Sequence, residues 1–438
     1  MEWYWTLLIL LGMLIGFMAI GLPVVFAFFA SNLIGAFIFM GGDRGELQLM
    51  RNAIDSVQNF ALLPIPLFIF MGEVMFHTGV AAKAIDAVDR LIARVPARLS
   101  LVAITGGTIF SSLSGSTIAN TAMLSSTLLP EMLKRGYHPS ISIGPIIAVG
   151  GIAMLIPPSA LAVLLGSIAQ IAIDELLLAS IVPAIILASM FFFYVIIRAK
   201  MNPSLAPAYE VERLSRWERI KPFLVYVLPL AGIFIVVVGS IIGGVATPTE
   251  SAALGVLATM IAAAGYRRLT VNNFIVAVRE TLKLTVMTLF IICGSITFSQ
   301  ILAFSQASDG LANLILGSGM SPLMIMLGML LVLMFLGCFM DQVSMMMITI
   351  PLFMPVITSL GLNPIWFGVL MLMVLEISLA TPPFGLLLFV AKGASPPNIG
   401  MGHIIRSVMP FIAMALIVVA LLIAFPQIAL WLPGLIVR

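Results

Sequence analysis

The segment that decides the fold runs from Ser112 to Ser159 and reads SLSGSTIANTAMLSSTLLPEMLKRGYHPSISIGPIIAVGGIAMLIPPS. It lies among long apolar segments, yet it contains small hydroxyl side chains, an amide, several glycines and a Pro-Pro pair. In hydrocarbon an unpaired backbone group is costly, so interrupted backbone persists only where protein or a cavity covers it. The segment therefore predicts interrupted helices that form a polar site inside a membrane protein.

The same pattern recurs 225 residues later in the chain. Of the 12 prolines in the first 213 residues, five meet another proline at this offset, whereas chance predicts about 0.7. The pairs are Pro23 with Pro248, Pro130 with Pro355, Pro139 with Pro364, Pro157 with Pro382, and Pro158 with Pro383. We therefore expect two structural repeats, residues 1–200 and 222–438, joined by a linker over residues 201–221.

The composition identifies the class of protein. Hydrophobic residues make up 61% of the chain and charged residues 9%, against about 25% charged residues in soluble domains. Many apolar runs approach the ~20 residues that a helix needs to cross a bilayer. The chain is expected to be an all-α polytopic protein of the lipid bilayer. Its net charge of +3 reflects lysines and arginines in loops rather than a surface for nucleic acid.

Apolar runs and their interruptions predict the same order of elements in both halves. Each half should hold three spans, a short surface segment, a re-entrant hairpin, a broken helix and a final span. In the first half these cover residues 3–20, 23–40, 60–76, 79–98, about 99–133, about 141–173 and 175–197. In the second half they cover residues 223–242, 248–268, 284–303, 308–319, about 323–360, about 366–390 and 404–431. Residues 41–59 are expected to form a polar connection.

The number of crossings predicts that the halves have opposite orientations. Five full crossings in each half would bring the second half into the membrane upside down. The positive charges agree, because Arg90, Lys134, Arg267 and the basic linker from Arg198 to Lys221 would all face the cytoplasm. Inverted repeats whose discontinuous helices meet at mid-membrane are typical of secondary transporters.

The first interruption supplies oxygen atoms without fixed charge. The hairpin tip carries the hydroxyls of Ser114 and Ser116, and Asn120 lies one helical turn further on. The break from Gly150 to Pro158 frees backbone carbonyls, because proline cannot donate to the helix ladder. Such oxygens suit a hard monovalent cation such as sodium. Helix capping and Ser/Thr packing between helices are the alternative explanation for the hydroxyls alone.

The second interruption adds a carboxylate. The offset of 225 places Asp341 opposite Ser116 and Thr381 opposite Ile156, and Ser344 follows one turn after Asp341. The paired arrangement favours ion binding over packing.

Other acidic residues have different interpretations. Glu376 lies in the second broken helix, where an acid is a functional candidate by default, although it could instead pair with Lys392 or with a loop cation. Glu250 follows Thr247 at a helix start, which favours a capping role. Glu73 and His77 are expected to be interfacial.

The motifs together resemble the large membrane subunit of tripartite ATP-independent periplasmic (TRAP) transporters. SGSTIANTAMLSSTLLPEMLKRGYHPS followed by IPPS is similar to the first hairpin and unwound helix of that family. TPTESAALGV, and the stretch MDQVSMMMITIPLFMPVITSLGLNPIWFGVLMLMVLEISLATPPFGLLLF, resemble its second half. The resemblance covers nearly the whole chain. It implies a sodium-coupled importer of elevator-type architecture in the bacterial inner membrane.

The resemblance also implies partners and site residues. The partners would be a small membrane subunit of about four helices and a periplasmic binding protein that delivers a small organic acid. Its first sodium site would use Ser114, Ser116 and Asn120, with carbonyls around Ala153, Ile156 and Pro158. Its second sodium site would use Asp341, Ser344 and Thr381. The candidates for the substrate site are Gly115, Pro157, Glu376, Pro382 and Pro383. In this family an amide often lies immediately at the first tip, whereas here the tip reads Ser-Gly-Ser-Thr.

Other functional classes fit less well. The histidines His77, His138 and His403 are scattered, and neither HExxH nor GxSxG occurs, so no enzyme or organic cofactor is predicted. No nucleotide-binding GxxxxGK[ST] loop is present, which favours an ion gradient as the energy source. A passive channel would not need two matched interruptions. A stand-alone sodium/anion symporter that needs no binding protein is the closest alternative. Sugar acids, dicarboxylates, keto acids and sulfonates all qualify as substrates.

Overall fold

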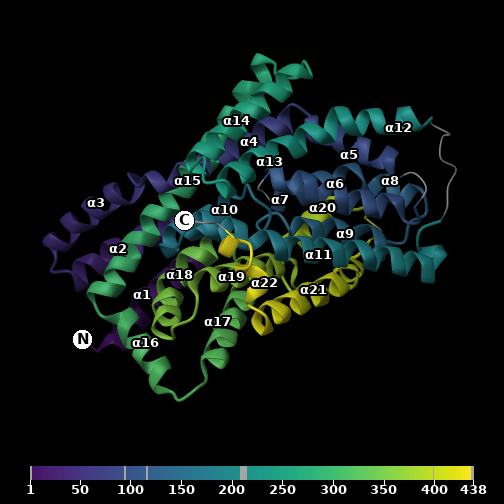
Figure 1. Cartoon of the computed structure of the whole chain (residues 1–438). Coiled ribbons are helices and arrows are strands. Elements are labelled where there is room, and N and C mark those ends of the chain that lie inside the picture. The colour runs from purple at the N-terminus through teal and green to yellow at the C-terminus, as the bar shows by residue number, and fades with distance from the viewer. Residues whose placement is uncertain (1, 93–94, 115–116, 208–214, 398, 436–438) are drawn as a thin grey trace.

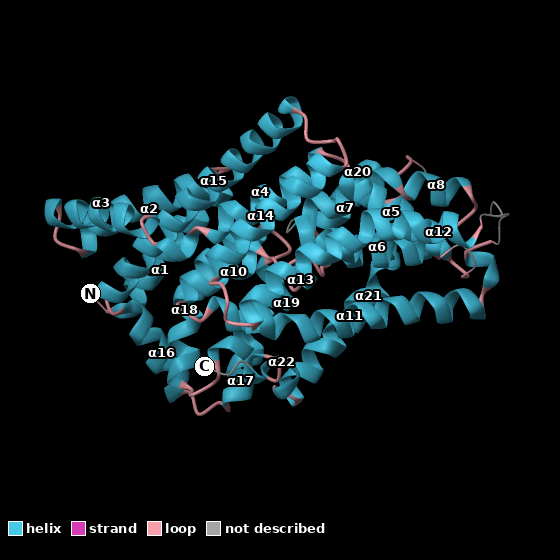
Figure 2. Cartoon of the chain, turned by 45° about the horizontal axis from the view of Figure 1, so that its top comes forward, coloured by secondary structure: helices cyan, strands magenta, loops and turns pink. Residues whose placement is uncertain are grey.

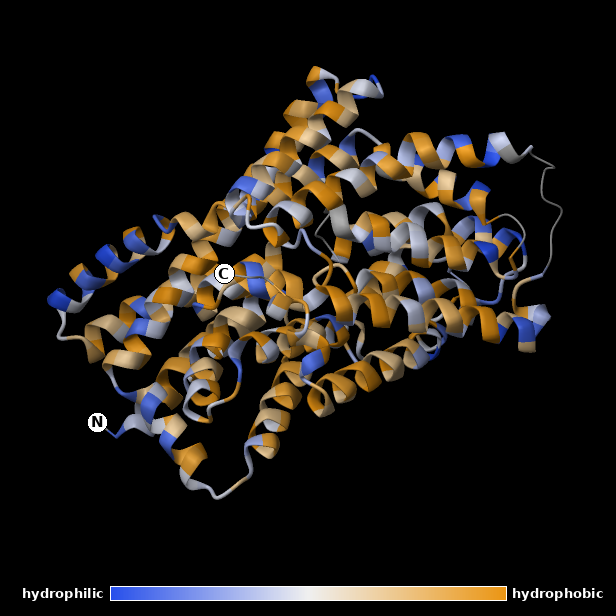
Figure 3. Cartoon of the chain, viewed as in Figure 1, coloured by the Kyte–Doolittle hydropathy of each residue, from blue (hydrophilic) through white to orange (hydrophobic). Residues whose placement is uncertain are grey.

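The computed structural model describes residues 2–92, 95–114, 117–207, 215–397 and 399–435, and within these ranges the chain forms helices joined by short loops, without strands (Figures 1 and 2). Six of the described helical segments are long and apolar enough to cross a membrane. They are Phe60–His77, Ile173–Met201, Trp217–Ile242, Val271–Phe304, Gln342–Ser359 and Met401–Ala424. Apolar residues cover most helices, and hydrophilic ones gather on α3 and at helix ends (Figure 3). The chain is therefore an all-α polytopic membrane protein.

Some helices of the two halves start at corresponding positions. The first half contains α1 (Trp3–Ala19), α2 (Val24–Phe39), α3 (Asp43–Val57), α4 (Pro64–His77), α5 (Val80–Leu91), α6 (Arg98–Ser114), α7 (Thr117–Thr127), α8 (Leu129–Lys134), α9 (Pro139–Gly150), α10 (Ala160–Ala169) and α11 (Ile173–Met201). The second contains α13 (Leu228–Ile242), α14 (Pro248–Gly265), α15 (Val271–Phe304), α16 (Ala307–Gly317), α17 (Pro322–Leu336), α18 (Gln342–Ser359), α19 (Pro364–Ala380), α20 (Leu386–Ala394), α21 (Met401–Ala424) and α22 (Gln427–Leu430). The first residues of α1 and α13, of α7 and α18, and of α9 and α19 are each 225 positions apart.

Three regions are more helical than the sequence pattern indicates. The connection expected over residues 41–59 contains the amphipathic helix α3, whose first turn carries Asp43 and Glu46. Acidic side chains in a first turn stabilise a helix through its dipole. Helix α15 begins at Val271 and runs through 34 residues, well before the expected start at residue 284. The linker ends in the short helix α12 (Arg216–Pro222).

The helix starts follow the local chemistry of the sequence. Thr247 accepts from the backbone N–H of Glu250, and the carboxylate of Glu250 accepts from the backbone N–H of Thr247 at 2.8 Å. This reciprocal pair satisfies two N–H groups that a helix start otherwise leaves without partners. The capping role expected for Glu250 is confirmed.

The two broken helices lie at the centre of the molecule. The chain leaves helical geometry after Gly150 and resumes it at Ala160. In the second half it does so between Ala380 and Leu386. The Pro-Pro peptide bond inside each break is cis. All residues of α19 from Trp366 to Ala380 are buried, as expected of a helix that is apolar on all sides.

Candidate functional site

The first hairpin is described on both sides of its tip. Helix α6 ends at Ser114 and α7 begins at Thr117, whereas the predicted site residues Gly115 and Ser116 lie outside the described residues. The side-chain amide of Asn120 donates to Ser111 Oγ and to the carbonyl of Gly107, the latter at 3.4 Å. Asn120 therefore joins the two arms of the hairpin. Its carbonyl oxygen Oδ1 has no hydrogen-bond partner among the described residues.

The first break presents backbone groups to the buried centre. Tight turns begin it, with Ile152 N–H donating to Val149 and Ala153 N–H donating to Gly150, both at 3.1 Å. Within the described chain, the carbonyls of Ala153, Ile156 and Pro158 accept no backbone hydrogen bond. Residues 152–155 and 157–158 are buried. The resemblance implies that these carbonyls bind sodium, which stays a prediction.

The second hairpin tip is held by its own carboxylate. Asp341 caps α18 by accepting from the backbone N–H groups of Val343 at 3.0 Å and Ser344 at 3.2 Å, and Ser344 Oγ also donates to it. Thr381 Oγ1 donates to the carbonyl of Ile377 at 2.7 Å, one turn earlier in α19. Asp341 and Ser344 are thus brought together directly. Thr381 belongs to the adjoining break.

Two residues that the sequence pattern did not single out join this tip to its break. Cys338 Sγ donates to the carbonyl of Pro382 at 3.5 Å. Gly337 lies so close to Ser378 that a Cβ atom at position 337 would overlap the serine side chain. Position 337 therefore requires glycine because the hairpin approaches α19 closely.

Glu376 lies where parts of both halves meet. Its side chain is buried, with 2% of the residue exposed. Its oxygen Oε1 accepts from Thr117 Oγ1 at 2.7 Å and from the backbone N–H of Met154 at 3.3 Å. The other oxygen, Oε2, has no hydrogen-bond partner among the described residues. One carboxylate of the second half therefore bridges the start of α7 and the first break.

Residues at equivalent positions of the two halves touch at this point. Gln342 Nε2 lies 3.5 Å from Thr117 Oγ1, and these residues are 225 positions apart. Gly151 and Glu376 have the same offset, and a Cβ atom on Gly151 would lie 3.8 Å from that of Glu376. Corresponding positions of the two halves therefore meet at this site, and the offset of 225 was the signal that could have identified Thr117 and Gln342.

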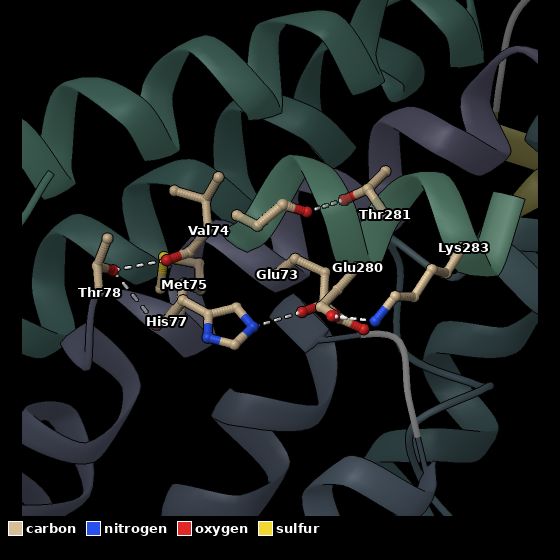
Figure 4. A network of polar contacts seen from close by, with 9 residues as sticks. Glu73, Val74, Met75, His77, Thr78, Glu280, Thr281 and Lys283 are labelled. Carbon is tan, nitrogen blue, oxygen red and sulfur yellow. Dashed lines mark hydrogen bonds and ion pairs between the residues drawn. The ribbon is translucent and has the colours of Figure 1, made fainter. Parts of the chain in front are cut away.

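Glu376 does not pair with Lys392, which donates instead to the carbonyl of Ile399 at 2.5 Å. No ion pair to Glu376 is present within the described ranges. In a second acidic cluster, both carboxylates, those of Glu73 and Glu280, do have a basic partner (Figure 4). There His77 lies 3.1 Å from Glu73 on α4, and Lys283 lies 2.6 Å from Glu280 on α15.

Two cavities adjoin the site. A cavity of about 30 Å³ lies beside Glu376, between the broken helices and helices α11 and α21. A larger one of about 710 Å³ reaches Asp341 and Ser344 from the side of α2 and α15, and its other walls are apolar. Among the described residues, no group of three or more His, Cys, Asp or Glu side chains is arranged to hold a metal. The oxygen donors present are hydroxyls, carbonyls and single carboxylates, which fit a monovalent cation.

Comparison with known proteins identifies the family. Residues 11–428 match the family model described as the tripartite ATP-independent periplasmic transporter, DctM component. The chain belongs to this family. It is 30% identical to the ectoine TRAP transporter large permease protein TeaC of Halomonas elongata, over 98% of this chain and 99% of that protein. It is 29% identical to the C4-dicarboxylate large permease protein DctM of Pseudomonas aeruginosa, over 87% and 88%.

The fold of this TRAP subunit also occurs among solved transporters. The structure of the YdaH transporter of Alcanivorax borkumensis superposes with a TM-score of 0.63 over 90% of both chains, at 16% sequence identity. The arrangement of helices in this chain is therefore one that other transporters share.

Proposed function

We propose that this TRAP subunit is a sodium-coupled secondary active transporter that imports a small organic acid across the bacterial inner membrane. The observation that carries the proposal is the meeting of interrupted helices from both halves around Glu376, Thr117 and Gln342. Interrupted backbone inside a membrane protein persists where it lines a binding site. Membership of a transporter family supports the same conclusion.

Sodium would bind at two sites, one in each half. The first would use Ser114, Ser116 and Asn120 with the carbonyls of the break around Ala153, Ile156 and Pro158. The second would use Asp341, Ser344 and Thr381. Free carbonyls in the first break and the paired Asp341 and Ser344 at the second tip support these assignments. Bound sodium would neutralise Asp341 and fix both tips.

The substrate would arrive from a separate periplasmic binding protein, and a small membrane subunit of about four helices would complete the transporter. The word tripartite in the family description supports three components. Relatives of similar identity are named for ectoine and for C4-dicarboxylates. Family membership alone therefore leaves the substrate class open, and the site residues must decide it.

The energy for uptake would come from the sodium gradient. One charge moving through 100 mV contributes about 2.3 kcal/mol. The hairpins and broken helices would move together as one unit against a static scaffold. The two halves would have opposite orientations in the membrane, and the amphipathic segment over residues 79–98 would connect the moving unit to the scaffold.

Uptake into proteoliposomes that contain both membrane subunits, with the binding protein outside, tests the proposal. We expect accumulation of the substrate only with an inward sodium gradient and only with the binding protein. Accumulation that persists without a sodium gradient would refute the coupling. Uptake without the binding protein would identify a stand-alone symporter instead.

Substitution of Asp341 tests the second sodium site. Asp341→Asn retains an oxygen that can accept from Val343 and Ser344, so the helix cap should survive. It removes the charge that would attract sodium, so we expect the sodium concentration for half-maximal uptake to rise at least tenfold. Asp341→Ala should in addition lower stability by about 1 kcal/mol through the lost cap. An unchanged sodium dependence in both variants would eliminate this site.

A further inference from the structure

The strongest unexplained feature of the molecule is the second oxygen of Glu376. This oxygen is buried, without a hydrogen-bond partner among the described residues, and no cation of the described chain pairs with the carboxylate. A buried carboxyl group carries a charge only at a high cost unless a cation pairs with it. A cation that entered from elsewhere would therefore find in Glu376 a partner that no cation of the described chain already occupies.

We propose that Glu376 is the counter-ion of a positively charged nitrogen in the substrate, so that the transported acid is a zwitterion. This inference rests on the proposed function, and it narrows the substrate class from organic acids in general to acids that also carry a protonated amine or amidinium. Simple dicarboxylates would then be poor substrates because their second anionic group would face the carboxylate. Simple sulfonates would be poor substrates because they carry no cationic group.

The position of Glu376 places it within reach of an enclosed substrate. Its contacts are Thr117, directly after the first tip, and Met154, inside the first break. Thr117 in turn contacts Gln342, the residue after Asp341 at the second tip. A substrate held between Thr117, Gln342 and the first break would therefore meet Glu376.

The small cavity beside Glu376 has the chemistry of a cation site. Its volume of about 30 Å³ is enough for one water-sized group such as an ammonium. Glu376 is the one charged residue of the lining, and the aromatic rings of Phe191 and Phe411 belong to the same wall. Aromatic faces attract ammonium groups, and the attraction increases when water is excluded.

A free metal ion fits this cavity less well than a nitrogen cation. Apart from the carboxylate, the lining side chains are aliphatic, aromatic or thioether groups. A hard cation requires several oxygen ligands, whereas a protonated amine needs one strong acceptor and can bury its carbon atoms against apolar walls.

The opposite end of a zwitterion also finds a place here. Helix α7 begins at Thr117, so its N-terminus starts at the site, whereas the N-terminus of α18 is already capped by the carboxylate of Asp341. Helix N-termini favour negative groups. The carboxylate of the substrate would lie toward the start of α7, away from Asp341, and its nitrogen would lie toward Glu376. This arrangement fixes one orientation of the substrate.

The first experiment identifies the chemical class of the ligand. The cognate binding protein is purified without refolding, and native mass spectrometry followed by ligand release identifies the compound that it retains. Matched probes, β-alanine against propionate, then show in a thermal-shift assay whether a nitrogen cation is required. We expect a zwitterionic ligand. A retained ligand that carries no positive nitrogen overturns the proposal.

The second experiment assigns the nitrogen to Glu376. Glu376→Gln keeps an oxygen for Thr117 and Met154 but removes the charge, and Glu376→Asp keeps the charge at a shorter reach. Removing one partner of a buried charge pair costs about 2–5 kcal/mol, so Glu376→Gln should reduce uptake of the identified ligand about 30-fold or more. Glu376→Asp should recover part of the uptake. Equal uptake by wild type and Glu376→Gln overturns the proposal.

Controls separate this inference from the proposed function. Wild-type protein that shows sodium-dependent uptake of a purely anionic ligand retains the proposed function and eliminates the zwitterion. Absence of any sodium dependence in wild type eliminates the proposed function itself.

Thermal unfolding of the purified subunit in sodium chloride, choline chloride and methylammonium chloride is a third measurement. Stabilisation by methylammonium that is lost in Glu376→Gln supports the site, and stabilisation by sodium alone that is lost there assigns it to a free ion.

Discussion

The two broken helices differ in where they stop, and the difference explains how the site is built. Helix α9 has 12 residues and ends at Gly150, whereas α19 starts at the corresponding proline and has 17 residues. Early unwinding in the first half frees the backbone N–H of Met154, which donates to Glu376. The longer helix in the second half presents the carboxylate at the position that corresponds to Gly151. One half thus supplies donors and the other supplies the acceptor.

The two hairpin tips also differ, because only the tip of the second half carries an acidic side chain. The first reads Ser-Gly-Ser at residues 114–116, and the second ends in Asp341, which caps its own helix. Both acidic side chains of the candidate site therefore come from the second half. Corresponding positions of the two halves meet at this site, so identical halves would bring like charges together, and divergence between the halves avoids this repulsion.

The largest effect is expected from giving the first half the same acidic residue as the second half at the position of Gly151. Gly151→Glu would place a second carboxylate against Glu376, because a Cβ atom on Gly151 lies 3.9 Å from Glu376 Oε2. An additional unpaired buried charge should cost about 3 kcal/mol or more. Gly151→Ala is the matched control, because its nearest contact, to the carbonyl of Ala148, is 3.3 Å. Chemical denaturation of the purified protein in mild detergent measures both, and equal stability of the two variants would show that the halves are interchangeable here.

The next effect concerns the contact between the second hairpin and α19. Gly337→Ala would force Ser378 to move, and Ser378 is fixed by a hydrogen bond to the carbonyl of Leu375 at 2.7 Å. Overpacking of this kind costs about 1–3 kcal/mol. Gly328→Ala, inside the helix α17 that ends just before Gly337, meets nothing within 4 Å, so it should be neutral or slightly stabilising. Denaturation curves compare the two, and a Gly337→Ala protein as stable as Gly328→Ala would contradict the close approach.

A smaller effect is expected from removing the hydroxyl of Thr117, which donates to Glu376 from the first half. Thr117→Val removes the hydrogen bond to Glu376, and hydrogen bonds to charged groups contribute about 1.5–3 kcal/mol. Thr121→Val, one turn further along α7, removes a buried hydroxyl without a partner among the described residues. It should leave stability unchanged or raise it. The order of the two denaturation midpoints is the measurement, and the reverse order would show that Thr117 does not bind Glu376.

Sequence reasoning recovered the parts of the fold that depend on periodic apolar runs and on proline. The breaks at Pro157 and Pro382 and the hairpin interruptions follow from chemistry that is visible locally, because proline and glycine interrupt helices in any context. Helix α3 was missed because its amphipathic pattern was interpreted as a polar connection. The start of α15 was missed because an apolar window ignores the polar turns that continue a helix beyond the hydrocarbon.

The contacts at the centre were less predictable. Glu376 was identified as a candidate from its depth, but its partners come from α7 and the first break, which are far away in sequence. The alternative that Glu376 pairs with Lys392 is wrong, because Lys392 donates to the carbonyl of Ile399 instead. The repeat offset contained the missing information, because Thr117 and Gln342 are counterparts, but only three-dimensional packing shows that they touch.

The smallest effect is expected from replacing one aspartate on each of the helices α5 and α16, which compares the two helices directly. Partial burial raises the pKa of Asp86 on α5, and Asp89 raises it further, against the opposing charges of Arg90 and Lys83. A raised pKa means that the folded state binds more protons, so this group stabilises the fold at low pH and loses that contribution as pH rises through its pKa. Asp86→Asn should therefore gain a few tenths of a kcal/mol at neutral pH and nothing in acid. Asp309→Asn, in the first turn of α16, should lose a similar amount because the helix dipole favours a carboxylate there. Denaturation at two pH values measures both, and the same sign for the two variants would contradict the difference between these helices.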